Sequence, residues 1–232
     1  MARHSEKRDL LAEMVGTFIL VFIGTGAVTM TKVAAAGHPF GVLEYLAIGT
    51  AFGVALMVAA YTVGPVSGAH LNPAVTIALA MENRLEKGRV IPYILAQCSG
   101  AILASLALLA LLGSSGHGLG ETTVGAWGIQ GALGAEGALT ALLVFTVLGL
   151  TEKSAPPGFA GLIIGLYLAA SHLVGIPFSG NSLNPARSLG PAVILGGDPL
   201  RQLLPVYVVG PLVGALIGVA IYRWVKGEGL LS

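Results

Sequence analysis

Residues 67–81, SGAHLNPAVTIALAM, lie between two long apolar runs and contain the tripeptide Asn72-Pro73-Ala74. Asn is a preferred residue just before a helix, and Pro suits the first helical position, where its missing N–H would have no partner. We therefore expect a helix that begins at Asn72 and ends near Met81. At 1.5 Å per residue it spans roughly 14 Å, about half the hydrocarbon thickness of a bilayer. That half-length needs an explanation.

The composition restricts the class of protein. Of the 232 residues, 55% are hydrophobic and 10% are charged. Soluble domains carry about 25% charged residues, so the chain is expected to be an integral membrane protein. The formal net charge of +1 gives no reason to expect nucleic acid as a partner. The one cysteine, Cys98, excludes an intrachain disulfide and a cysteine-based metal cluster, and we expect neither a metal nor a cofactor.

Six stretches contain the roughly 20 apolar residues that a membrane-spanning helix needs. They are residues 10–32, 42–63, 90–112, 133–151, 159–177 and 202–223. Two shorter segments, 72–82 and 184–195, follow the second and the fifth span, and each begins Asn-Pro-Ala. The loops before them, 64–71 and 178–183, contain Gly, Pro and Ser, which are poor continuers of a helix. We expect both loops to be non-helical.

The basic residues predict the orientation. With six spans, both termini lie on one side of the membrane, and nine of the twelve basic residues fall on that side: Arg3, Lys7, Arg8, Arg84, Lys87, Arg89, Lys153, Arg223 and Lys226. Lys32, Arg187 and Arg201 fall on the other side. The positive-inside bias therefore places both termini in the cytoplasm, in a plasma or inner membrane.

The chain also repeats itself as one domain, 1–232, with halves at about 10–112 and 133–224. Ala12-Glu13 recurs as Ala135-Glu136, and Ser67-Gly68, before the first Asn-Pro-Ala, recurs as Ser179-Gly180 before the second. Three spans separate the halves, an odd number, so the second half would be inverted relative to the first. Inverted repeats place their site near the bilayer midplane, where broken helices meet. Two half-length helices that enter from opposite faces would meet there by their N-termini.

These motifs resemble the aquaporins, the major intrinsic protein family. The resemblance is carried by SGAHLNPAV, SGNSLNPARS, the six spans and the glutamates in the first helix of each half, and it extends from about Leu11 to Trp224. It implies an all-α membrane protein with six transmembrane helices and two re-entrant half-helices. It further implies a homotetramer in membrane lipid with a water-conducting pore in each subunit, in the water-selective and prokaryotic part of the family.

The paired tripeptides, Asn72-Pro73-Ala74 and Asn184-Pro185-Ala186, would face each other in the pore. Each asparagine would cap its helix through the side-chain oxygen and leave its NH₂ group free to face the pore. A water between the two helix ends must then turn its oxygen toward both amides. Each helix N-terminus adds roughly half a positive charge, which would repel cations. The simpler alternative is that both asparagines are only caps.

The resemblance also implies a selectivity filter and its supports. Arg187 follows the second tripeptide, where the first half has Val75, and a charge inside a membrane indicates a functional site. By register, Phe52, His172 and Asn181 complete the filter, with Asn181 contributing chiefly its carbonyl. Five loop residues would supply further pore carbonyls: Gly68, Ala69, His70, Gly180 and Ser182. Glu13 and Glu136 would hold these loops by accepting backbone N–H groups, although a proton relay is an alternative role.

The filter residues favour water over glycerol, because an aromatic ring, an imidazole and a guanidinium make a small polar aperture. Glycerol facilitators of the family typically have a small residue in place of His172 and an Asp in place of Ser188. The single aromatic of Tyr207-Val208, where water channels commonly have two, leaves passage of glycerol or hydrogen peroxide open as an alternative. An ion-coupled transporter and a structural membrane protein are two further alternatives, and the sequence shows no grouping of residues typical of an enzyme.

Overall fold

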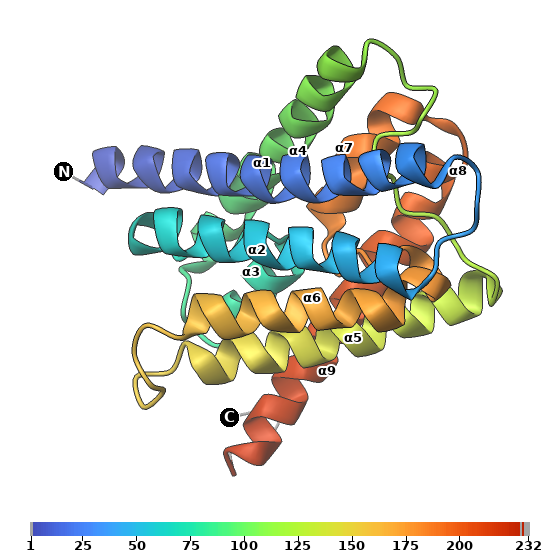
Figure 1. Ribbon diagram of the computed structural model, residues 1–232. Coiled ribbons are helices and arrows are strands. Elements are labelled where there is room, and N and C mark those ends of the chain that lie inside the picture. Colours follow the sequence, from blue (N-terminus) through green and yellow to red (C-terminus); the bar gives the residue numbers. More distant parts are fainter. Residues whose placement is uncertain (1, 228, 230–232) are drawn as a thin grey trace.

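The computed structural model describes residues 2–227 and 229, with side chains from residue 6 onward (Figure 1). The predicted domain, 1–232, therefore extends outside the described residues at 1, 228 and 230–232, and the side chain of Arg3 lies outside them too. Within the described part, the secondary structure is helical: α1 (Ala2–Ala35), α2 (Val42–Ser67), α3 (Pro73–Met81), η1 (Lys87–Arg89), α4 (Val90–Leu112), α5 (Gly128–Leu150), α6 (Ala160–Ser179), α7 (Pro185–Leu195), α8 (Gly197–Gln202), η2 (Leu203–Val208) and α9 (Val209–Val225).

Six helical segments of the described chain are long and apolar enough to cross a membrane, which confirms the predicted number of spans. They are Glu6–Ala35, Val42–Ser67, Lys87–Leu112, Gly128–Leu150, Ala160–Ser179 and Gly197–Val225. The sixth is less regular than predicted, because α8 and a π-helical turn, η2, precede α9. Pro205 lies in that turn and has no N–H to donate, so the regular α-helical hydrogen-bond ladder is interrupted there.

The predicted starts of the loops 64–71 and 178–183 are wrong, because the helix before each loop is longer than predicted. The second helix continues through Pro65 to Ser67, and the sixth labelled helix, α6, continues through Pro177 to Ser179. Each then ends at a left-handed glycine, Gly68 or Gly180. At membrane depth an open backbone group has no water to bind, so the helix continues until the loop beyond it can satisfy its own polar groups.

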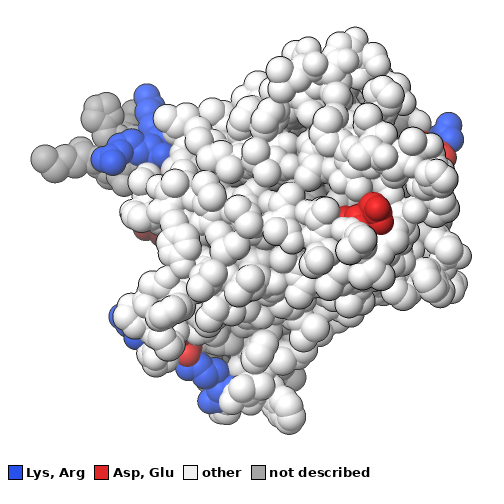
Figure 2. Space-filling model, viewed as in Figure 1, with Lys and Arg blue, Asp and Glu red and all other residues white. Residues whose placement is uncertain are grey.

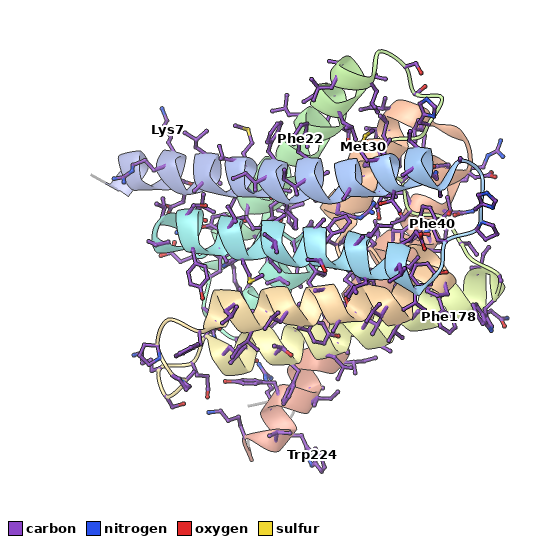
Figure 3. All side chains as sticks on the ribbon, in the orientation of Figure 1. Lys7, Phe22, Met30, Phe40, Phe178 and Trp224 are labelled. Atoms are coloured by element: carbon purple, nitrogen blue, oxygen red, sulfur yellow. The ribbon has the colours of Figure 1, made fainter. Side chains whose placement is uncertain are left out.

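The charged side chains support a membrane orientation along the helix axes. In Figure 2 the blue and red atoms lie mostly toward two ends of the visible face, and the band between them is largely white. Lys7 and Trp224 lie toward the end that carries both termini, whereas Phe40 and Phe178 lie toward the opposite end (Figures 1 and 3). An apolar band between two charged rims is the surface that a bilayer requires.

The two halves pack in corresponding ways. Helix α1 packs against α2 and α4, and α5 packs against α6 and α9. Helices α2 and α6 pack against each other and join the halves. Each half-helix also contacts the last long helix of the other half, α3 against α9 and α7 against α4. The half-helices are therefore enclosed by long helices from both halves.

Two glycines at matching places allow the closest helix crossings. A Cβ on Gly100 of α4 would lie 2.2 Å from the carbonyl oxygen of Met14, and a Cβ on Gly214 of α9 would lie 2.3 Å from that of Gly137. Both clashes are with backbone of the first helix in the same half, which cannot move aside as a side chain could. Small residues at such crossings let membrane helices pack without a hydrophobic driving force between them.

We predict that Gly100→Ala and Gly214→Ala each lower the free energy of unfolding by about 1–3 kcal/mol, because the added methyl group separates the two backbones. Unfolding of the purified protein in mixed micelles, followed by circular dichroism, measures the change. Gly149→Ala is the matched control, since a Cβ there has nothing within 4 Å. Equal stability of all three variants would show that the crossings tolerate a methyl group.

Candidate functional site

The two half-helices begin where the sequence predicted. The side-chain oxygen of Asn72 accepts a hydrogen bond from Ala74 N at 2.9 Å, and that of Asn184 accepts from Ala186 N at 3.0 Å. The proline that follows each asparagine takes the first helical position. The asparagine oxygens are thus occupied as N-caps, and only the amide nitrogens are left to act elsewhere.

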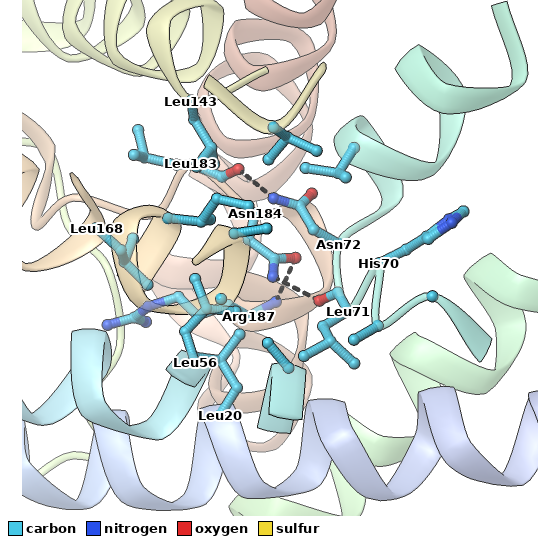
Figure 4. Close-up of a pocket in the computed structure, with 18 of the residues that line it drawn as sticks. Leu20, Leu56, His70, Leu71, Asn72, Leu143, Leu168, Leu183, Asn184 and Arg187 are labelled. Carbon is cyan, nitrogen blue, oxygen red and sulfur yellow. Dashed lines mark hydrogen bonds between the residues drawn. The ribbon is translucent and has the colours of Figure 1, made fainter. Parts of the chain in front are cut away.

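Those nitrogens form a reciprocal clasp between the halves, which is drawn in Figure 4. Asn72 Nδ2 donates to the carbonyl of Leu183 at 2.7 Å, and Asn184 Nδ2 donates to the carbonyl of Leu71 at 2.8 Å. The expectation that both NH₂ groups are free is therefore wrong for one hydrogen of each. An amide nitrogen carries two hydrogens, so one per asparagine remains for a molecule beside it.

The loops before the half-helices share an uncommon backbone conformation. In the first loop φ is +90° at Gly68, +49° at Ala69 and +54° at Leu71. In the second loop Gly180, Asn181 and Leu183 repeat the pattern at +73°, +54° and +55°. Left-handed backbone at a residue with a side chain costs roughly 1–2 kcal/mol. Such strain persists only where the surroundings hold the loop in place.

In the first half a buried carboxylate holds the loop. Glu13, on α1, accepts hydrogen bonds from Ser67 Oγ at 2.7 Å, from His70 N at 2.9 Å and from Leu71 N at 2.7 Å. The glutamate is fully buried. Because two consecutive N–H groups point at the carboxylate, the peptide groups of the loop are oriented with their N–H side toward α1.

The second half repeats this arrangement. Glu136, on α5, accepts from Ser179 Oγ at 2.7 Å, from Ser182 N at 2.8 Å and from Leu183 N at 2.7 Å. It too is fully buried. Charge-assisted bonds of this kind are about twice as strong as neutral ones, which offsets part of the strain in the left-handed loops.

The halves differ in a polar group that sequence reasoning missed. Gln97, on α4, donates to Glu13 Oε2 and to Thr76 Oγ1, each at 2.8 Å. Its counterpart in the second half is Pro211, which has no such group. An amide in the middle of an otherwise apolar span was the signal that could have identified Gln97. The carboxylate of the first half therefore has one more donor.

Three of the predicted filter residues lie together. The ring of Phe52 stacks on that of His172 with centroids 4.7 Å apart, and the guanidinium carbon of Arg187 lies 5.0 Å from the centroid of Phe52. All three are almost fully buried. His172 Nδ1 lies 2.7 Å from the carbonyl of Leu168, and His172 Nε2 has no hydrogen-bond partner in the described chain.

Arg187 lies where two cavities meet. The inner cavity, about 170 Å³, extends from Arg187 past both asparagines to Thr151, toward the end that carries the termini. The outer cavity, about 340 Å³, lies on the other side of Arg187 and reaches Lys32 and Phe40. Arg187 Nη1 donates to the carbonyl of Gly120 at 2.8 Å, which sequence reasoning did not predict.

The remaining predicted site residues divide between the cavities. Of the five residues expected to contribute pore carbonyls, four line the inner cavity: Gly68, Ala69, His70 and Ser182. Gly180 lines the outer cavity. Asn181 lies beside His172, with its Nδ2 3.0 Å from His172 Nδ1, and its amide fills the space left by Gly175. Neither His172 nor Asn181 belongs to the wall of either cavity.

We predict that Glu136→Gln destabilises the protein strongly. The substituted amide presents its NH₂ group to one of the loop N–H donors, and a buried donor left without an acceptor costs about 1–3 kcal/mol. Unfolding in mixed micelles measures the loss. Glu44→Gln is the matched control, because Glu44 is only partly buried and caps the start of α2 by accepting from Gly41 N. If the two variants lose the same stability, the carboxylate of Glu136 does not hold the loop.

Comparison with known proteins agrees with this arrangement. The family model described as major intrinsic protein matches residues 1–222. Aquaporin Z of Bradyrhizobium diazoefficiens is 40% identical over 234 residues, covering 96% of this chain and 95% of that protein. Glycerol uptake facilitator protein-like 6 of Lactiplantibacillus plantarum is 41% identical over 225 residues, covering 95% of this chain and 99% of that protein.

A solved structure is similar over the same length. The X-ray structure of the aquaglyceroporin from Plasmodium falciparum superposes with a TM-score of 0.83 at 25% sequence identity, covering 95% of this chain and 97% of that one. The resemblance inferred from the two Asn-Pro-Ala tripeptides is confirmed by these matches. The family model thus matches nearly the whole of this chain, and the two relatives are about 40% identical to it over nearly its full length. This chain belongs to the major intrinsic protein family.

Proposed function

We propose that this protein is a passive water channel that conducts water in single file and excludes protons and ions. The observation that carries the proposal is the meeting of two cavities at Arg187, beside the stacked rings of Phe52 and His172. A polar constriction between two open chambers is the geometry of a selective pore. The relative named Aquaporin Z supports water as the permeant.

The asparagine pair supplies the second barrier. Asn72 and Asn184 line the inner cavity at the N-termini of α3 and α7, and each terminus carries roughly half a positive charge. The remaining amide hydrogens turn the oxygen of a passing water toward them. A water held in this way donates to its neighbours on both sides, which interrupts a continuous relay for protons.

Glycerol remains the second candidate permeant, because one relative is named a glycerol uptake facilitator protein-like and the similar structure an aquaglyceroporin. The stacked rings of Phe52 and His172 beside Arg187 support water, since bulky side chains at this point favour a small aperture. In the pair Tyr207-Val208, the single aromatic, Tyr207, is fully buried and donates to the carbonyl of Ser179 at 2.9 Å, as Tyr93 does to Ser67 in the first half. Its role is to anchor a loop.

An ion-coupled transporter would need carboxylates available to bind the coupling ion. The glutamates inside the spans, Glu13 and Glu136, each accept three or more hydrogen bonds from the protein. This occupancy favours a channel without coupling. It likewise favours a structural role over a proton relay for both residues.

The membrane setting follows from the six apolar spans and the family. The excess of basic residues at the end with the termini supports a cytoplasmic location for both of them. We further propose a homotetramer with one pore in each subunit, in a plasma or inner membrane. Long apolar side chains exposed on the outer helices, such as Leu43, Leu142 and Leu166, form a surface that both lipid and neighbouring subunits can contact.

The test is osmotic shrinkage of proteoliposomes by stopped flow, first with sucrose and then with glycerol. A water channel shrinks them much faster than empty liposomes with either solute, and with glycerol the volume then recovers no faster than in empty liposomes. Fast recovery would identify a glycerol facilitator. Permeability equal to that of empty liposomes would indicate a structural protein, and dependence on a proton or sodium gradient would indicate a coupled transporter.

We predict that Arg187→Val admits protons and larger solutes, while Phe52 and His172 still limit the width. Removing about 1.4 kcal/mol from the electrostatic barrier raises proton leak about tenfold. A pH-sensitive dye trapped in proteoliposomes measures the leak, with Arg187→Lys as the variant that retains the charge. If Arg187→Val keeps the selectivity of the wild type, Arg187 does not form the filter.

A further inference from the structure

The outer cavity contains a carboxylate close to the filter. Lys32, Glu121 and Arg187 all line this cavity, together with the imidazole of His38. Lys32 lies in the last turn of α1, and Glu121 lies in the loop between α4 and α5. Two cationic side chains and one carboxylate thus line one cavity. The cation that does not pair with the carboxylate keeps its positive charge uncompensated.

Glu121 is paired with Lys32. Lys32 Nζ donates to Glu121 Oε1 at 2.8 Å, and Leu119 N donates to Glu121 Oε2 at 3.0 Å. Burial alone would raise the pKa of Glu121, but the hydrogen bond and charge of Lys32 hold the pKa below its ordinary value. The carboxylate is therefore ionised at neutral pH. Its side chain is 13% exposed and that of Lys32 is 43% exposed.

Arg187 has no carboxylate within ion-pair distance in the part of the chain that the structure describes. Its Nη1 donates to the carbonyl of Gly120, the residue directly before Glu121, and its Nε has no hydrogen-bond partner there. Arg187 consequently lines both cavities without a carboxylate bound to its guanidinium. Glu121 nevertheless follows Gly120 directly, lines the same cavity as Arg187 and interacts with its charge, so its carboxylate is a candidate partner for the guanidinium.

The loop that carries Glu121 is held independently of Lys32. A Cβ on Gly120 would lie 2.4 Å from the carbonyl oxygen of Thr25, so the loop packs closely against the backbone of α1. Thr122, just beyond it, is buried, and its hydroxyl lies 2.8 Å from that of Ser188 on α7. Loss of Lys32 would therefore leave Oε1 of Glu121 without its cation and would not displace the loop.

We propose that Lys32 is a specificity-determining residue, because it binds Glu121 and so keeps that carboxylate away from the guanidinium of Arg187. The proposal rests on the proposed function of Arg187 as the filter residue. Without Lys32, Arg187 is the cationic side chain of the described residues that still lines this cavity with Glu121, and carboxylate–guanidinium pairs are strong and often bidentate. Pairing would neutralise the charge that repels cations at the constriction.

The test uses four variants in proteoliposomes: Lys32→Met, Lys32→Arg, Glu121→Gln and the double variant Lys32→Met/Glu121→Gln. Osmotic shrinkage reports water flux. A trapped pH-sensitive dye reports proton leak under a potassium diffusion potential set by valinomycin. Lys32→Met is expected to raise proton leak by about three- to tenfold, with Lys32→Arg at the wild-type level.

The double variant separates charge from structure. If Lys32 acts by holding the carboxylate, removing that carboxylate as well restores the low leak. A double variant as leaky as Lys32→Met would overturn the proposal and indicate a structural role for the pair. Unchanged leak in Lys32→Met, with water flux intact, would overturn it as well, whereas a wild type without water flux would contradict the proposed function instead.

Two further variants complete the design. Arg201→Met is the matched control, because Arg201 pairs with Asp198 at 3.3 Å, both side chains are highly exposed, and neither lines the outer cavity. It should leave proton leak unchanged, and an increase equal to that of Lys32→Met would contradict the proposal. Lys32→Gln, which also lacks the charge, replaces Lys32→Met if that variant does not fold, with the same expected leak.

Discussion

The reciprocal clasp at the midplane depends on each half completing the other. Asn72 donates to the backbone of the second loop and Asn184 to the backbone of the first, so the amide nitrogen of each asparagine has its carbonyl acceptor in the other half. The carbonyls that receive these bonds belong to left-handed residues, Leu71 and Leu183, which the buried glutamates hold in that conformation. In a membrane, where water cannot substitute for a lost partner, this mutual satisfaction keeps non-helical backbone at the centre of the bilayer.

Within this near-symmetric frame, the proposed chemistry comes from the places where symmetry fails. Arg187 corresponds to Val75, so a charge stands at one mouth of the passage and an apolar side chain at the matching place in the other half. The loop between α4 and α5 supplies the carbonyl that orients this charge. Two similar halves line the passage, and because they differ at these positions, a molecule meets different side chains at its two ends.

Local sequence signals predicted the features that depend on neighbouring residues. Asn72 and Asn184 start helices because capping involves only the next few residues, and the spans follow from apolar length. The starts of the loops were predicted wrongly, because Pro65 and Ser179 were taken as poor continuers of a helix, although each lies in the last turn of its helix, α2 or α6. The clasp could not be predicted, because each of its bonds joins residues more than 100 positions apart. For the same reason no local pattern identified the carbonyl of Gly120.

The clasp also has a consequence for biosynthesis. The carbonyl of Leu71 receives its bond from Asn184, which is translated 113 residues later. At about 5–20 residues per second, the ribosome needs on the order of ten seconds to cover that distance. For that interval the first re-entrant segment is in the translocon or the bilayer without its final partner. Insertion of this chain should therefore be completed in one late step, when the second half arrives, and nascent chains that stop before residue 184 should keep their first pore segment near water.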